Sequence, residues 1–256
     1  MRIAVCVKQV PDSYAEKRMQ GGRVDRAASD RVLNDLDEYA IEAALRLAEA
    51  NEGTQVTVVS VGPDEAGEAI RRALAMGAND AIHVSDPAIA GSDAPATARI
   101  LAATLAGRGF DVIMFGQEST DAKMGVVQAM VATLLELPLL SYASAVAIDG
   151  TTVRITRRTE EGLEGMAAGM PVALAVVEYI HEPRYPSFKG IMAARKAPLE
   201  RLDLAALGLD PASVGDAGSR TAVLEAAPRP PRAKGAVVTT DGAAALAAYL
   251  TTEKLV

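Results

Sequence analysis

Aromatic side chains and basic charge are both scarce in this sequence of 256 residues. Only 4% of the residues are aromatic, Trp is absent, and the formal net charge is −7. Proteins that bind single strands stack bases on aromatic rings, and both DNA and anionic membranes attract a basic surface. We therefore expect neither nucleic acid nor an anionic membrane as the main partner.

Cysteine and histidine are rarer still. Cys6 is the single cysteine, and His83 and His181 are the only histidines. One thiol cannot form an intrachain disulfide or a tetrahedral cysteine site, and two distant histidines give little material for a zinc site or a Ser/His/Asp triad. We expect no metal site, no catalytic residues, structural roles for both histidines, and a reducing compartment.

Long apolar runs and leader signals are also lacking. No uninterrupted apolar stretch approaches the ~20 residues that a membrane helix needs. Residues 1–5 enter a strand-like run directly, without the charged region, apolar region and cleavage site of a secretory signal. These observations predict a cytoplasmic protein without membrane insertion.

Two glycine-rich nucleotide motifs are missing as well. The strand expected to end at Val7 is followed by residues 8–14 without G-x-G-x-x-G, and no G-x-x-x-x-G-K-[ST] motif occurs in the sequence. A bound nucleotide would therefore need another device to hold its phosphate.

Half of the residues are hydrophobic, and up to about residue 137 they alternate between short runs and longer runs of helical period. This alternation predicts an open, mostly parallel, doubly wound α/β sheet with crossover helices. The expected strands are 3–7, 56–61, 81–84 and 112–115, and the expected helices begin near Asp37, Asp64 and Asp93 and after Asp121.

The pattern of residues 141–178 predicts strands joined by a hairpin turn. Runs at 144–148 and 153–158 flank Asp149-Gly150, a strong hairpin signal, and a third run covers 172–177. We expect these strands to extend the sheet as antiparallel edge strands.

From Glu178 onward the sequence predicts a loop with a short helix, and then an extended C-terminal arm. We expect an α/β domain over residues 1–200 and, over 201–256, a linker arm with a short helix that packs on a partner subunit. Residues 228–231 read as a semi-rigid proline-rich linker, and 243–250 as the short helix.

The segment that follows the fourth expected strand is a candidate anion site. Gly116 to Met124 is small and polar and leads into a helix, whose N-terminal amides and dipole attract negative charge. If the strand order reverses between the first and fourth strands, Cys6 lines the same crevice. The alternative is an ordinary strand-to-helix connection with Asp121 as the N-cap.

A second candidate is an aromatic segment near residue 180. Tyr179, Tyr185 and Phe188 fall within ten residues, and basic residues border them. Aromatic and Arg side chains are enriched in protein-binding hot spots, which favours a docking loop. The other interpretation is that Phe188 folds back over an edge of the core, and the pattern alone favours this second interpretation.

Three segments resemble the beta (small) subunit of electron transfer flavoproteins. They are Val7-Lys8-Gln9-Val10-Pro11-Asp12, residues 72–84 (RALAMGANDAIHV), and the stretch from Arg184-Tyr185 to Ile191-Met192-Ala193-Ala194. A further signature appears as Arg157, Glu160-Glu161-Gly162, Glu164 and Pro171. The likeness runs in order from residue 1 to about 200, and it implies a Rossmann-like fold of the adenine nucleotide alpha hydrolase type.

The resemblance implies an electron carrier subunit rather than an enzyme. It implies a heterodimer with an alpha subunit that holds most of the FAD site, AMP in this chain, and electron flow from flavin dehydrogenases, such as the acyl-CoA dehydrogenases of fatty acid oxidation, to a respiratory-chain quinone oxidoreductase. Three alternatives stay open: a bifurcating or nitrogen-fixation type with a second FAD and NADH oxidation, a nucleotide-hydrolysing enzyme of the same architecture, and a nucleotide-sensing binding protein.

The resemblance also assigns residues by position. Tyr14, or Ser13 beside it, would lie near the flavin. Val126 and Val127 replace a frequent polar pair, so backbone amides would hold the phosphate. The docking loop would comprise Arg184, Tyr185, Phe188, Lys189 and Ile191, with Phe188 as the apolar anchor. The AMP pocket would comprise Cys6, Asn34, Val61, Gly116, Glu118, Ser119, Asp121, Ala122, Lys123, Met124, Gly125, Val126 and Val127.

Overall fold

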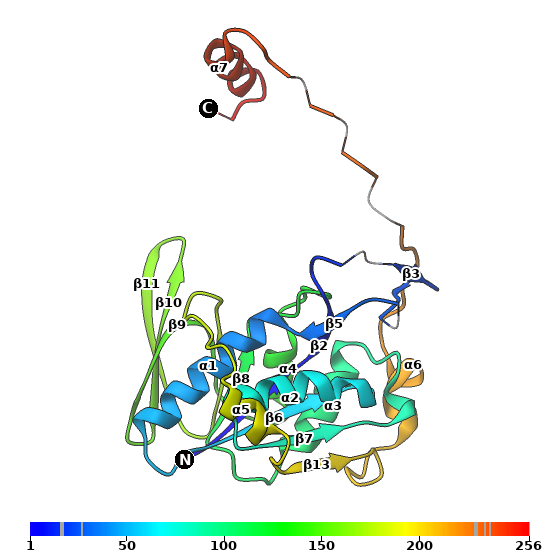
Figure 1. The fold of residues 1–256 in the computed structure, drawn as a ribbon, viewed down its shortest axis with the longest axis vertical. Helices are drawn as coiled ribbons and strands as arrows, with labels where there is room; N and C mark the ends of the chain where they lie inside the picture. Colours follow the sequence, from blue (N-terminus) through cyan, green and yellow to red (C-terminus); the bar gives the residue numbers. More distant parts are fainter. Residues whose placement is uncertain (16–17, 27, 228–229, 233, 236, 256) are drawn as a thin grey trace.

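A nine-stranded sheet organises the computed structural model, which describes residues 1–15, 18–26, 28–227, 230–232, 234–235 and 237–255 (Figure 1). The strand order is β11-β10-β9-β12-β8-β1-β6-β7-β13. Its parallel centre contains all four strands expected from the first half of the sequence: β1 (Arg2–Val7), β6 (Gln55–Val61), β7 (Asp80–Val84) and β8 (Val112–Gly116).

Helices cover both faces of this sheet, as a doubly wound fold requires. The first face packs in one apolar cluster with α1 and α2, and the second face packs in another with α3 and α4. The central strands are buried on both faces, which explains their continuous apolar runs. The bounds are α1 (Asp35–Ala50), α2 (Gly67–Met76), α3 (Ala94–Leu105) and α4 (Val127–Leu134).

The second half of the sheet corrects one expectation. The third expected strand, 172–177, is β12 (Val172–Val176), and it pairs in parallel with both β8 and β9 instead of extending the sheet antiparallel. Its five residues are all buried, which a position between two strands under helices produces. The antiparallel pairs are those of β10 with its neighbours, where the bounds are β9 (Leu139–Asp149), β10 (Thr152–Thr159) and β11 (Gly162–Gly169).

Several short elements complete the fold, and of those that follow only the helix at Phe188–Ala194 was expected, as the short helix after Glu178. At the far edge β13 (Leu199–Leu202) pairs in parallel with β7, and α5 (Phe188–Ala194) packs beside α2. A 3-10 turn at Asp64–Ala66 precedes α2. Two small antiparallel pairs follow β1: β2 (Gln9–Pro11) with β5 (Arg31–Leu33), and β3 (Met19–Gln20) with β4 (Arg23–Val24).

The chain after β13 first packs on the α3 side of the sheet and then continues into the C-terminal arm. Leu204 and Val214 are buried against the α3 side, and α6 (Gly215–Gly218) follows. Asp93, the N-cap of α3, then accepts hydrogen bonds from the backbone N–H groups of Arg220 and Thr221 at 2.7 and 3.1 Å. The arm therefore has a fixed origin on α3.

The last helix, α7 (Gly242–Thr252), lies away from the sheet in Figure 1. Within the expected linker 228–231, Pro228 and Arg229 lie outside the described residues. The division of the chain at residue 200 stays a prediction. No helix in the described ranges is both long and apolar enough to cross a bilayer.

Candidate functional site

The carboxyl ends of β1 and β8 meet at the point where the strand order reverses. Strand β1 pairs with β6 on one side and with β8 on the other, so successive connections leave in opposite directions. Cys6 lies in register with Val59 of β6 and Phe115 of β8. This arrangement confirms the predicted neighbourhood of the first and fourth strands, and ligands bind at such a crevice in open α/β sheets.

The loop 117–126, which follows β8, is fixed to α1 by the side chain of Asn34. The amide nitrogen of Asn34 donates to the Glu118 carbonyl at 2.9 Å, and its amide oxygen accepts from the Thr120 N–H at 3.0 Å. Asn34 is fully buried and is the N-cap residue of α1. The structure thus places Asn34 beside the loop, in contact with the loop's own backbone, and its predicted part in a nucleotide pocket stays a prediction.

A buried carboxylate anchors the same loop to β1. The Lys8 ammonium donates to Asp121 at 2.7 Å and to Ser119 at 3.3 Å, and Arg26 also pairs with Asp121. Although burial favours the neutral carboxyl group, the charge of Lys8 and the hydrogen bonds from Lys8, Arg26 and Ser119 lower the pKa of Asp121 to about 2. Asp121 therefore stays ionised, with its charge neutralised by the two cations.

Helix α4 begins later than expected and without the expected cap. It starts at Val127, its N-cap is Val126, and no side chain caps it, so the alternative in which Asp121 caps this helix is wrong. The ion pairs with Lys8 and Arg26 hold Asp121 within the loop, before Val126. Gln128 closes the loop instead, donating to the Gly125 carbonyl at 2.7 Å and to the Gln117 carbonyl at 3.2 Å.

Three backbone amides before α4 are free to bind an anion. Within the described chain, the N–H groups of Met124, Gly125 and Val126 donate no hydrogen bond. Lys123 and Gly125 adopt left-handed φ angles of 50° and 59°, which turn the backbone sharply at this place. Adjacent free amides next to a helix N-terminus can hold one phosphate group.

Apolar side chains line the end of β1 on the α3 and α4 side of the sheet. Cys6 belongs to the cluster under α3 and α4, and Val61 and Val127 pack against that cluster. Burial raises the pKa of the Cys6 thiol, and the nearby Asp37 carboxylate raises it further. The thiol therefore stays protonated, and it forms part of an apolar wall rather than acting as a nucleophile.

Three of the remaining predicted residues are exposed at the surface of the loop. Met124 is 56% exposed, and Ala122 and Lys123 are exposed as well. The hydroxyl of Thr120 is buried and has no hydrogen-bond partner among the described residues. A hollow of about 420 Å³ opens on the α1 side of the loop, lined by Asp35, Leu36, Tyr39, Glu118, Thr120, Lys123 and Glu178. Cys6 and Val61 do not line this hollow.

The aromatic segment of the predicted docking loop is exposed. Phe188 is 81% exposed, Tyr185 is 85% exposed and Tyr179 is 60% exposed. The interpretation that Phe188 folds back over the core is wrong, because α5 begins at this residue and the core contact of α5 is made by Ala194. Lys189 and Ile191 are exposed on the same short helix.

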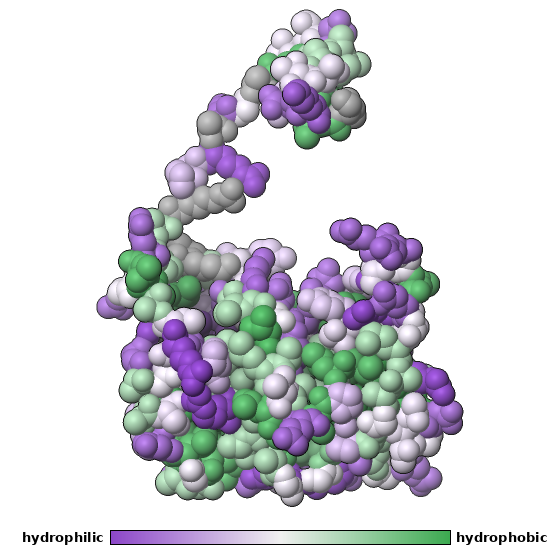
Figure 2. All heavy atoms as spheres, turned by 180° about the vertical axis from the view of Figure 1, so that it is seen from behind, coloured by the Kyte–Doolittle hydropathy of each residue, from purple (hydrophilic) through white to green (hydrophobic). Residues whose placement is uncertain are grey.

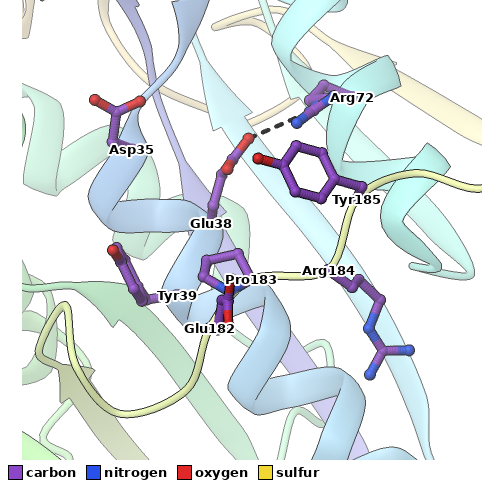
Figure 3. A pocket seen from close by; sticks show the side chains of 8 residues that line it. All are labelled: Asp35, Glu38, Tyr39, Arg72, Glu182, Pro183, Arg184 and Tyr185. Carbon is purple, nitrogen blue, oxygen red and sulfur yellow. Dashed lines mark hydrogen bonds and ion pairs between the residues drawn. The ribbon is translucent and has the colours of Figure 1, made fainter.

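Arg184 holds the start of this segment against α1. Its Nε donates to Glu42 at 2.7 Å, and its guanidinium also pairs with Glu49. Burial alone would raise the pKa of Glu42, but hydrogen bonds from Arg184 and Arg46 bring this pKa below its ordinary value. In Figure 3 the Arg184 guanidinium points away from a hollow of about 260 Å³, in which the Tyr185 ring lies beside the ion pair of Glu38 and Arg72.

Tyr14, the residue predicted near a flavin, is 98% exposed in the loop after β2. The two histidines lie apart from this loop. His83 is fully buried in β7, its Nε2 lies 3.2 Å from the Gly62 carbonyl, and burial lowers the pKa of its ring. No group of three or more His, Cys, Asp or Glu side chains in the described ranges is placed to hold a metal ion.

Comparison with known proteins identifies the family. The electron transfer flavoprotein domain family matches residues 22–207. The electron transfer flavoprotein subunit beta of Mycobacterium bovis is 40% identical over 263 residues, which cover 99% of both chains. The subunit beta of Megasphaera elsdenii is 37% identical, covering 93% of this chain and 91% of its own. The caffeyl-CoA reductase-Etf complex subunit CarD of Acetobacterium woodii is 34% identical, covering 93% and 92%.

The chain belongs to the electron transfer flavoprotein family. Within this family it is of the beta-subunit type, so its role is electron transfer. A beta subunit works with an alpha subunit and with flavin in the complex. The predicted family and fold class are confirmed.

Three residues of this electron transfer flavoprotein subunit make anchoring contacts that the sequence did not predict. Lys8 and Asp37 hold the crevice at the ends of β1 and β8, and Glu42 receives the Arg184 clamp. Two of them could have been recognised in the sequence, because Asp37 and Glu42 interrupt the apolar face of α1. A carboxylate on a buried helix face requires a partner, and that requirement points to an anchoring role.

Proposed function

We propose that this chain is the beta subunit of a heterodimeric electron transfer flavoprotein that binds AMP, while the alpha subunit holds most of the FAD site. The complex accepts electrons from flavin dehydrogenases, such as acyl-CoA dehydrogenases, and passes them to a respiratory quinone oxidoreductase. The observation that carries the proposal is the loop 117–126, which is anchored at three points and presents free amides after the end of β8, the neighbour of β1.

The residues of the crevice fit an adenine nucleotide with a single phosphate group. The amides of Met124, Gly125 and Val126 match one phosphate, and the side chains of Val126 and Val127 add no polar donor for a second. Cys6 and Val61 supply an apolar surface for a purine ring. The unpartnered Thr120 hydroxyl is a buried polar atom in the same loop. Bound AMP would stabilise the fold by joining the loop to β1.

Exposed apolar groups support an alpha-subunit interface. Leu246 and Tyr249 are each 57% exposed and lie three residues apart on α7, which places them on one face of that helix. Apolar side chains also gather on the face of the body seen in Figure 2, and Leu134 of α4 is 53% exposed. We propose that α7 and its arm pack on the alpha subunit.

The cofactor content of the purified complex tests this function. When the chain is co-purified with its alpha subunit and denatured, we expect chromatography of the supernatant to give one FAD and one AMP per complex. Two FAD and no AMP would support the bifurcating type with a second FAD in this chain. A complex without flavin would contradict both types.

If Phe188 anchors the docking contact, replacing it should slow electron transfer from the donor and leave the fold unchanged. We expect Phe188→Ala to leave flavin content and thermal stability unchanged, because the ring is 81% exposed, and to slow flavin reduction by the donor dehydrogenase about tenfold, as expected for a hot-spot anchor. Stopped-flow absorbance measures this rate. Leu163→Ala is the control, because Leu163 is 70% exposed on β11, outside the docking segment. Equal rates for both variants would remove Phe188 from the interface.

A further inference from the structure

Helix α5, which begins at Phe188, presents different side chains on its two faces. With 3.6 residues per turn, Phe188, Ile191 and Met192 fall on one face, and Gly190 and Ala194 fall on the other. The first three side chains are 81%, 43% and 42% exposed, whereas Ala194 is buried in the apolar cluster that includes α1 and α2. We call Phe188, Ile191 and Met192 the docking face of α5.

The other face of α5 meets the end of α2, and Gly190 lies at the contact. The two helices lie side by side (Figure 1). A Cβ at Gly190 would lie 2.3 Å from the Ala75 carbonyl oxygen and 3.4 Å from the carbonyl carbon. Real Cβ atoms essentially never come within 3.0 Å of such an atom, so only glycine fits at this separation. The Cα hydrogen that stands in place of Cβ points at the oxygen, as in a Cα–H···O contact.

The position of Ala75 in α2 makes this contact unyielding. Ala75 is the last residue but one of α2, and it is buried together with its neighbours Leu74 and Met76. Its carbonyl oxygen belongs to the helix backbone, so no change of rotamer could make room for a Cβ at Gly190. A side chain at position 190 would therefore move α5 away from α2.

The backbone conformation of Gly190 does not itself require glycine. Gly190 is the third residue of α5, and its φ angle lies outside the left-handed region. Its N–H donates to the hydroxyl of Ser187, the N-cap residue, at 3.0 Å. Alanine favours helices more than glycine does, so alanine at this position would strengthen an isolated helix. Helix preference and the contact with α2 therefore predict opposite effects for Gly190→Ala.

Two contacts fix the docking face relative to the rest of the molecule. Arg184 joins the start of the segment to Glu42 and Glu49 of α1, and Gly190 seats α5 on α2. Because the docking face lies opposite Gly190 on the helix, any movement of α5 away from α2 displaces the docking face as well. An apolar surface that is already in place saves a partner the cost of ordering it on binding.

Resting on the proposed docking role of Phe188, we propose that Gly190 is a positioning residue for docking to the donor dehydrogenase. The missing side chain lets α5 seat on the Ala75 carbonyl, and this contact holds the docking face in place for an apolar pocket on the donor. Gly190 acts through Phe188, Ile191 and Met192, and it needs no contact with the donor itself.

Steady-state reduction of the complex with the alpha subunit by an acyl-CoA dehydrogenase tests this role. We expect Gly190→Ala to raise the KM for the complex about tenfold and to change kcat by less than about twofold, because only the pre-organisation of the contact is lost. Flavin content and the rate of flavin reduction by dithionite, which needs no docking, are expected to stay unchanged. Gly190→Ser adds the same Cβ and is expected to match Gly190→Ala. Gly165→Ala is the matched control, because nothing lies within 4 Å of a Cβ at that position.

An unchanged or lower KM in Gly190→Ala, with a raised KM in Phe188→Ala, would overturn the role of Gly190 and leave the docking role of Phe188 standing. An unchanged KM in Phe188→Ala would overturn the docking role, and the inference with it. Loss of flavin from Gly190→Ala, or an equal rise of KM in Gly165→Ala, would show an effect on the whole fold and contradict the inference. A dehydrogenase that does not reduce the unmodified complex would contradict the proposed function itself.

Discussion

Gly116→Ala is expected to destabilise the protein by about 3 kcal/mol and to abolish nucleotide retention. A Cβ at this position would lie 2.5 Å from the Leu36 carbonyl oxygen and 2.6 Å from Asp37 Oδ1. The Leu36 oxygen belongs to the backbone of α1, so the clash cannot be relieved by a rotamer change. The N-terminus of α1 must move off β8, and the contacts of Asn34 with the loop move with it.

Urea unfolding of the complex and its AMP content measure the effect of Gly116→Ala. Gly165→Ala is the matched control, because nothing lies within 4 Å of a Cβ at Gly165 in β11. We expect the control to change the free energy of unfolding by less than about 0.5 kcal/mol. Equal unfolding midpoints for the two variants would show that α1 and β8 tolerate a wider separation than their contact indicates.

Arg184→Ala is expected to lower stability by about 2 kcal/mol and to slow reduction by the donor dehydrogenase more than about tenfold. The substitution leaves the Glu42 carboxylate, whose side chain is 2% exposed, with Arg46 as its remaining partner. Arg46 is half exposed, which keeps the loss below that of a fully orphaned charge. The kinetic effect follows because Tyr185 and Phe188 lose their fixed position before binding.

Thermal unfolding and stopped-flow reduction measure both effects of Arg184→Ala. Arg195→Ala removes an exposed cation at the end of α5 and is expected to change neither quantity strongly. Arg184→Lys keeps the charge but lacks the planar fork that reaches Glu42 and Glu49 together, so it should recover only part of the stability. A donor rate unchanged in Arg184→Ala would show that the clamp does not position the docking segment.

The parallel centre of the fold was predictable because independent local signals agree there. Gly77 ends α2 and Asp93 caps α3, and the apolar period of each segment matches its element. The hairpin half was less predictable. The continuous run at Val172–Val176 carried the signature of a central strand, but its position between β8 and β9 depends on pairing with distant segments. Strand β11 contains three glycines, which weaken its β propensity.

The location of the site was predictable, but the contacts that hold it were not. A polar loop after a strand indicates an anion site wherever it occurs. The bonds from Lys8 to Asp121 and from Arg184 to Glu42 join residues 113 and 142 positions apart, and no local pattern records them. The orientation of Phe188 likewise depends on how α5 packs on α2, since a Cβ at Gly190 would meet the Ala75 carbonyl at 2.3 Å.

The hydrogen bonds of Asp93 with Arg220 and Thr221 determine how far the C-terminal arm can reach from the body. They fix one end of a tether of about twenty residues before α7, whose fully extended length is about 70 Å. A tethered surface meets its target at an effective local concentration, in the millimolar range for short flexible linkers, instead of the free protein concentration. While the body is bound to a partner, a weak contact through α7 would therefore stay occupied, and the length of the arm sets that occupancy.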